Sequence, residues 1–247
     1  QNVSASLSVT NITSAIGGAD QMSVEEIRNY ISFNFSAQNR AVTINDYLSK
    51  LRLMPSAFGA PAKAGVTELE NKVMLNILSY TPSGKLTSKV PEALKNNVSE
   101  FLSNHRMMND YISVGSAKVI DLKFEIDLVL ENSSSQGKVI SNVINKVGDY
   151  FNIDKIEMGQ DLPLGKLRGL IMEQSGIVNI VNLKVYNIVG GEHSQSQTTQ
   201  PLFNPTTREI NLLDDTIYAQ PDEILQIRFS EKDIAIRVQT PNKPSYT

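Results

Sequence analysis

Residues 120–130 place a large apolar side chain at every second position, and this pattern constrains the fold more than any other segment. The apolar positions are Ile120, Leu122, Phe124, Ile126, Leu128 and Leu130, and the polar positions between them are Asp121, Lys123, Glu125 and Asp127. Because successive side chains of a β-strand point to opposite faces, one face of this strand is core and the other faces water. Such a strand is typical of an antiparallel or mixed sheet with a single covered face.

The segment that follows supplies two helices for the apolar face of this strand. A polar turn at 132–137 leads into a helix whose inward residues are Val139, Ile140, Val143, Ile144, Val147 and Phe151. A short strand at 155–158, a helix at 163–174 and a strand at 177–188 complete a β-α-β-α-β unit. We therefore predict that residues 113–190 form a central α+β domain of ferredoxin-like character.

Two capping boxes predict a pair of short helices near the start of the chain. Ser23 with Glu26, and Thr43 with Asp46, have the spacing at which the two side chains cap the helix N-terminus reciprocally. Apolar residues recur behind each box at helical spacing, including Tyr47 in the second helix. Each cap is expected to contribute about 1 kcal/mol.

The helix pattern does not assign a role to Arg40, which precedes the second capping box. Pairing with Asp20 or Asp46 would tie the turn to the helix start. A phosphate contact is less favoured, because no second basic residue lies within five positions of Arg40.

The remaining N-terminal sequence divides into a connector and one module. Residues 1–22 are polar with short β-type runs and are interpreted as a connector or edge strand. Residues 23–112 are predicted to hold the helix pair and an α/β module, with a strand at 66–80 and a helix at 91–104. The predicted fold class is thus α+β, with two modules of helices and antiparallel sheet.

Three short motifs in residues 17–47 resemble one protein family. They are Gly-Gly-Ala-Asp from Gly17, Ser-x-Glu-Glu-Ile-Arg from Ser23, and Arg-Ala-Val-Thr-x-x-Asp-Tyr from Arg40. Together they resemble the baseplate J-like family of contractile-tailed phages and related injection machines. The nearest likeness is to the wedge-ring subunits of T4-type phages, and it extends over most of the chain.

The resemblance implies a structural virion protein of the tail baseplate, assembled in the cytoplasm of the host bacterium. Its partners would be a second copy of itself, as a dimer within a ring around the central hub, and other baseplate wedge proteins. It would rearrange when the tail sheath contracts. The start at Gln1 without a methionine favours the C-terminal part of a longer chain.

The C-terminal third reads as a polar linker followed by a β-hairpin region. Residues 191–205 are rich in Ser, Gln and Thr and have few apolar residues to bury, and loops of this length are usually functional or disordered. Residues 206–247 contain short strands, the last two of which are interpreted as an edge hairpin. A lone hairpin is marginally stable, so it must join another sheet in this subunit or a neighbour. The candidate interface residues are Leu225, Ile227, Phe229, Ile234, Ile236 and Val238.

Composition excludes several classes of function. The net charge is −3, and the 23 basic residues form no run, which disfavours nucleic-acid binding. No apolar stretch approaches the roughly 18 to 20 residues of a membrane span, so membrane insertion is not expected. The chain has no cysteine and hence neither a disulfide nor a thiolate metal site.

The sequence shows no constellation of catalytic residues. His105 and His193 lie in different segments without metal-ligand spacing, and are interpreted as a helix-end residue and a solvated loop residue. The glycine pairs do not form a nucleotide-binding loop, and the loop around Lys63 contains a proline and lacks the second Gly-Lys pair of a phosphate loop. We therefore expect no enzyme activity, no cofactor, no metal and no small-molecule substrate. The alternative is a soluble carbohydrate- or peptide-binding module in which residues 190–200 form the ligand loop.

Overall fold

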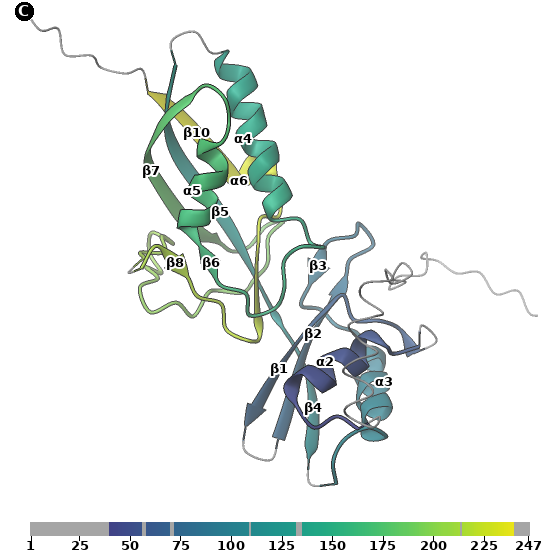
Figure 1. Cartoon of the computed structure of the whole chain (residues 1–247). Coiled ribbons are helices and arrows are strands. Elements are labelled where there is room, and N and C mark those ends of the chain that lie inside the picture. The colour runs from purple at the N-terminus through teal and green to yellow at the C-terminus, as the bar shows by residue number, and fades with distance from the viewer. Residues whose placement is uncertain are drawn as a thin grey trace, which may run out of the picture.

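The computed structural model describes residues 40–55, 58–69, 72–108, 110–131, 135–212 and 214–239. They form two lobes, each built of a β-sheet with helices packed on it (Figure 1). The chain passes from the smaller to the larger lobe at Ala117, between the end of β4 and the start of β5. The predicted α+β class is confirmed.

The smaller lobe has its longest strand at the centre of its sheet. Its elements are α2 (Ile44–Arg52), β1 (Lys63–Leu69), β2 (Lys72–Tyr80), β3 (Leu86–Thr87), α3 (Glu92–Ser103) and β4 (Tyr111–Ser116). Strand β2 pairs antiparallel with β1 and β3 and parallel with β4. The prediction of one strand at 66–80 is wrong, because the chain reverses within that range and forms β1 and β2. Helices α2 and α3 bury Tyr47, Leu51, Val98 and Leu102 against this sheet.

The larger lobe is arranged around β5. Its elements are β5 (Lys118–Leu130), α4 (Gln136–Tyr150), β6 (Leu162–Pro163), α5 (Leu164–Met172), β7 (Ile177–Ile188), β8 (Thr216–Ile217), β9 (Glu223–Gln226), α6 (Ser230–Asp233) and β10 (Ile234–Gln239). Strand β7 pairs antiparallel with β5 on one edge, and β10 pairs parallel with β5 on the other. The sheet is mixed, as the single covered face of β5 indicates.

The apolar face predicted for β5 is the main core of the protein. All six apolar residues from Ile120 to Leu130 are at most 4% exposed. Helix α4 packs Val139, Val143 and Val147 into the same cluster, and α5 adds Leu164, Leu167 and Ile171. The helices predicted at 139–151 and 163–174 and the strand at 177–188 are thus confirmed.

The ferredoxin-like arrangement is present only in part. Residues 155–158 form turns rather than the predicted strand. The middle strand is instead β6, which pairs with β8 outside the main sheet. The expected strand was wrong because this short segment has only two apolar residues, Ile156 and Met158, which join the core cluster of the larger lobe without a strand partner.

The predicted C-terminal hairpin is also wrong. Strands β9 and β10 do not pair with each other, and both pair parallel with β5. Asp121 pairs with Ile188 of β7 on one side and with Gln226 of β9 on the other, so β9 and β10 follow one another along the same edge. Helix α6 interrupts them. Strands β9 and β10 therefore complete the central sheet.

Side chains and backbone from both lobes meet at their junction. Leu78 and Leu86, from the end of the small sheet, belong to the core of the larger lobe. Gly65 of β1 lies so close to Pro221 that an added Cβ would collide with the Pro221 carbonyl oxygen. Only glycine, which has no Cβ, fits at a position where two backbones approach so closely. The lobes are therefore packed directly on each other at this point.

Candidate assembly surface

The capping box predicted at Thr43 is present at the start of α2. The Asp46 N–H donates to Thr43 Oγ1 at 3.2 Å, and the Thr43 N–H donates to Asp46 Oδ2 at 2.8 Å. Partial burial would raise the pKa of Asp46, but the hydrogen bonds from Thr43 and Val42 outweigh it and hold the pKa below its usual value. Ser23 and Glu26, the other predicted box, lie outside the described residues.

Tyr47 is buried, whereas Arg40 is exposed. Tyr47 is 2% exposed, and its hydroxyl donates to Asp110 Oδ2 at 2.8 Å, which ties α2 to the chain before β4. Burial, followed by the neighbouring Asp110 carboxylate, raises the pKa of Tyr47. Arg40 is exposed at the edge of this group. Thr43, Asp46 and Tyr47 therefore cap and anchor α2, as the predicted capping box and the apolar spacing behind it indicate.

Thr43→Ala should lower the free energy of unfolding by about 1 kcal/mol, because the Asp46 N–H loses its cap. Chemical denaturation of the variant beside Asn45→Ala, an exposed neighbour in the same helix, measures the difference. A Thr43→Ala protein as stable as the Asn45→Ala control would show that the cap contributes nothing.

Five of the six residues predicted as an interface lie in the core or pack against it. Leu225, Ile227 and Ile234 are at most 8% exposed, and Ile236 and Val238 pack against the same cluster. Phe229 is half-buried, with the Lys85 ammonium 3.4 Å from its ring centroid. The expected exposed surface is wrong because β9 and β10 add to β5 of the same chain.

The predicted polar linker at 191–205 is bound to the larger lobe by hydrogen bonds. The Ser194 N–H donates to Asp121 Oδ2, and the Thr198 N–H donates to Asn187 Oδ1 at 3.0 Å. Asp121 and Asn187 are both fully buried. The pattern of β5 placed Asp121 on the wet face, and that expectation is wrong because this segment covers it. Burial raises the pKa of Asp121, and the hydrogen bond from Ser194 opposes the shift.

His193 belongs to the same packed region. Its Nε2 lies 3.0 Å from Asp233 Oδ1, its side chain is 14% exposed, and its ring stands edge-on to Phe229. The interpretation of His193 as a solvated loop residue is therefore wrong. His105 follows α3 and packs its ring on Phe101, with centroids 5.0 Å apart. The two histidines are held by structural contacts in separate lobes.

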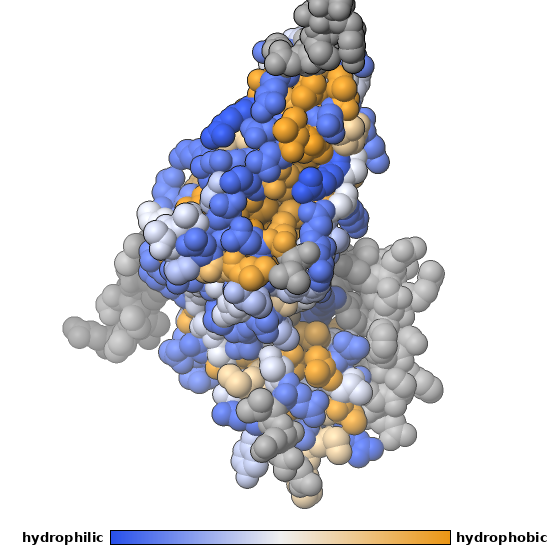
Figure 2. All heavy atoms as spheres, turned by 90° about the vertical axis from the view of Figure 1, so that its left-hand side faces the viewer, coloured by the Kyte–Doolittle hydropathy of each residue, from blue (hydrophilic) through white to orange (hydrophobic). Residues whose placement is uncertain are grey.

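The first half of β7 is an apolar strand at an edge of the larger sheet. On the side of β7 that faces away from β5, residues 208–210 form hydrogen bonds with β7 only from Val185 onward. In the described part of the chain, no strand pairs with residues 177–184 on that side. The register against β5 skips Val178 and Val181, so both are bulged, and each is 51% exposed. Figure 2, which faces the side where β7 lies in Figure 1, shows apolar side chains gathered in a stripe on this lobe.

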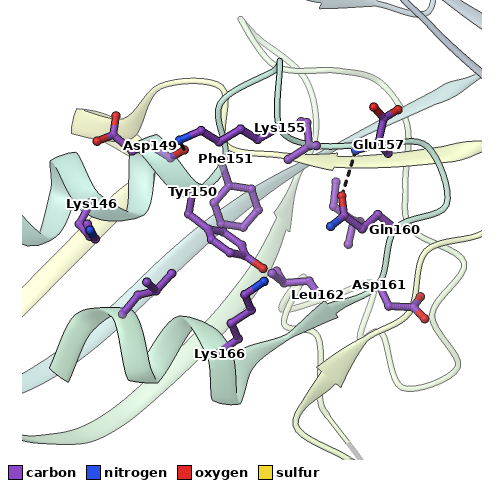
Figure 3. A pocket seen from close by; sticks show the side chains of 13 residues that line it. Lys146, Asp149, Tyr150, Phe151, Lys155, Glu157, Gln160, Asp161, Leu162 and Lys166 are labelled. Carbon is purple, nitrogen blue, oxygen red and sulfur yellow. Dashed lines mark hydrogen bonds between the residues drawn. The ribbon is translucent and has the colours of Figure 1, made fainter. Parts of the chain in front are cut away.

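A pocket of about 410 Å³ opens beside α4 and α5 (Figure 3). Its apolar lining consists of Phe151, Ile156, Leu162, Leu170 and Leu225. Its polar lining consists of Lys146, Asp149, Tyr150, Lys155, Glu157, Gln160, Asp161 and Lys166. Neither histidine contributes to it, so no neutral-pH base faces this space.

A metal-binding cluster and a membrane-spanning helix are both absent from the described ranges. No group of three or more His, Asp or Glu residues there is arranged to hold a metal ion. None of the described helices combines the length and hydrophobicity that crossing a lipid bilayer requires.

Comparison with known proteins gives a likeness at the level of structure and none at the level of sequence. No protein-family model matches the sequence, and no curated protein matches it. A chain in a cryo-electron microscopy structure of the anti-feeding prophage (AFP) baseplate, symmetrised six-fold, is similar with a TM-score of 0.54 over 86% of this chain. The two chains share a fold. Their sequence identity is 9%, and this protein spans 43% of that chain, so the likeness concerns the fold alone.

Proposed function

We propose that this protein is a structural subunit of a contractile-tail baseplate and acts by docking against other subunits. The supporting observation is the fold shared with the prophage baseplate chain over 86% of the length. The resemblance of the segment from Arg40 to Tyr47 to the baseplate J-like family also supports this proposal. The proposed place is the virion tail, after assembly in the bacterial cytoplasm.

The finer proposal is a wedge-ring subunit of the kind that the product of gene six forms in T4-type phages. In that role two copies associate, further wedge proteins bind, and the ring around the hub rearranges on sheath contraction. A closed ring needs a self-complementary or a head-to-tail contact.

The edge of β7 is the proposed contact with a second copy. Residues 177–183 contain no charged side chain, so two copies can face each other there without electrostatic repulsion. The bulges at Val178 and Val181 interrupt the ladder, and bulged edges resist strand addition. We therefore expect contact through the valine side chains rather than through a continuous sheet.

Light scattering over a range of concentrations tests this assignment. The wild-type mass should rise above the 27.3 kDa of one chain, while the double variant Val178→Lys, Val181→Lys should remain monomeric. Both valines are half-exposed, so the substitutions should leave the melting temperature nearly unchanged.

Val42→Lys is the matched control, because Val42 is 56% exposed in the other lobe. It should associate like the wild type. A wild-type mass that stays at one chain at every concentration would contradict self-association. A double variant that associates as well as Val42→Lys would remove β7 from the contact.

The alternative of a carbohydrate- or peptide-binding module with residues 190–200 as ligand loop has less support. The backbone N–H groups of Ser194 and Thr198 are committed to Asp121 and Asn187 inside the protein. A loop whose polar groups satisfy buried partners has fewer left for a ligand.

A further inference from the structure

The carboxylates around the pocket at α4 and α5 are directed away from its centre. Glu157 reaches Arg52 at 3.5 Å and Lys63 at 3.6 Å, both in the smaller lobe. Asp161 Oδ1 accepts the Ala219 N–H at 2.9 Å. Figure 3 shows the carboxylates of Asp149, Glu157 and Asp161 at the periphery, pointing outward. The acidic residues of the rim therefore do not neutralise the middle of the pocket.

The centre of the pocket holds two hydrogen-bond donors. The Tyr150 hydroxyl and the Lys166 ammonium point toward one another there (Figure 3). The Lys166 nitrogen is 5.8 Å from the centroid of the Tyr150 ring. Within the described part of the chain, neither group is hydrogen-bonded to another residue. A carboxylate placed beside both groups would receive hydrogen bonds from the hydroxyl and from the charged ammonium.

Beside these donors the pocket is lined by apolar side chains. Phe151 and Leu162 are at most 4% exposed, and Phe151 meets the Tyr150 ring edge-on at 5.3 Å. The volume of about 410 Å³ lies in the range of pockets that enclose a ligand group. A bare phosphate would leave this lining unfilled, whereas an apolar side chain would cover it.

We propose that this pocket binds a peptide segment of a partner protein in which an apolar side chain stands next to a carboxylate. The apolar side chain rests on Phe151 and Leu162, and the carboxylate is bound by Lys166 and Tyr150. The assignment of the segment to a partner protein depends on the proposed assembly role. The choice of an apolar side chain and a carboxylate depends only on the residues that line the pocket.

Nuclear magnetic resonance titration with short peptides tests this proposal. The probe is acetyl-Ala-Phe-Asp-Ala-amide. Its controls are the same peptide with Asn for Asp, the same peptide with Ala for Phe, and the free acid N-acetylphenylalanine. The first peptide should shift the amide resonances of residues around Tyr150 and Lys166, and each control peptide should bind at least about tenfold more weakly.

Variants separate the two donors. Lys166→Met should weaken binding of the acidic peptide about tenfold or more, and Tyr150→Phe by about threefold to tenfold. Lys138→Met, which removes an exposed lysine of α4 outside the pocket, should leave binding unchanged.

The proposal is overturned if the Asn peptide binds as well as the Asp peptide, if Lys166→Met binds like Lys138→Met, or if no peptide perturbs the pocket. If N-acetylphenylalanine binds and the peptide does not, the ligand is a small acid and the assignment to a segment of a partner protein is wrong. The titration is also run on the monomeric Val178→Lys, Val181→Lys variant, so its failure and a failure of self-association remain distinct results.

Discussion

Phe124→Ala should lower the free energy of unfolding by roughly 3 to 5 kcal/mol, the range of large-to-small substitutions in a protein core. The Phe124 side chain is fully buried, and its ring packs on Phe151 with centroids 5.6 Å apart. Truncation removes this contact and leaves a cavity between β5 and α4, where packed neighbours on both sides prevent collapse. Urea denaturation of the isolated chain measures the loss.

Lys123→Ala is the matched control on the opposite face of β5. Lys123 is partly exposed and pairs with Glu125 at 3.2 Å, and surface ion pairs contribute at most about 1 kcal/mol. Equal stability losses in the two variants would mean that the covered face of β5 has been assigned wrongly.

Gly65→Ala should destabilise the protein toward the upper end of the roughly 1 to 3 kcal/mol typical of overpacking. The new Cβ would collide with the Pro221 carbonyl oxygen and lie 3.3 Å from Met158 Cβ. Because the obstacle is backbone, no rotamer change relieves it, and β1 must move away from the larger lobe. Thermal unfolding followed by circular dichroism measures the decrease.

Gly169→Ala supplies the control for this substitution. Gly169 lies in α5 with open space around its Cβ position, and alanine there should stabilise the helix by about 0.5 to 1 kcal/mol. A Gly65→Ala protein that melts as high as Gly169→Ala would show that the lobes are not in direct contact at this position.

The parts of the fold that sequence alone predicted are those fixed by local pattern. The alternation in β5, the apolar stripes of α4 and α5, and the Thr43 box depend on neighbours within a few residues. The separation of β1 from β2 also had a local signal in the sequence, because the polar residues Glu70, Asn71 and Lys72 precede the apolar run of β2. The prediction of a single strand at 66–80 did not take these polar residues into account.

Tertiary pairing could not be predicted in the same way. The alternation in β9 and β10 marks two strands, but nothing local shows that both add to β5 instead of to each other. The burial of Asp121 depends on Ser194, which is distant in sequence. The polar composition of residues 191–205 suggested a solvent-exposed segment, although backbone N–H groups of this segment donate hydrogen bonds to buried side chains of the sheet.

The candidate site was predicted only in part. Thr43, Asp46 and Tyr47 were identified with their structural roles. Of the six apolar residues from Leu225 to Val238 that were assigned to a surface, Phe229 is half-buried and the other five lie in or against the core. The exposed valines of β7 were missed. Their signal is the repeat Ile-Val-Asn-Ile-Val-Asn at 177–182, whose period of three departs from strand alternation and indicates bulges.

Hydrogen–deuterium exchange at a low and a high protein concentration tests most directly whether this protein works by docking onto a second copy. The prediction is slower exchange at high concentration in residues 177–183, with β10 unchanged, and loss of that protection in the Val178→Lys, Val181→Lys variant. Exchange that is identical at both concentrations throughout the chain would contradict it.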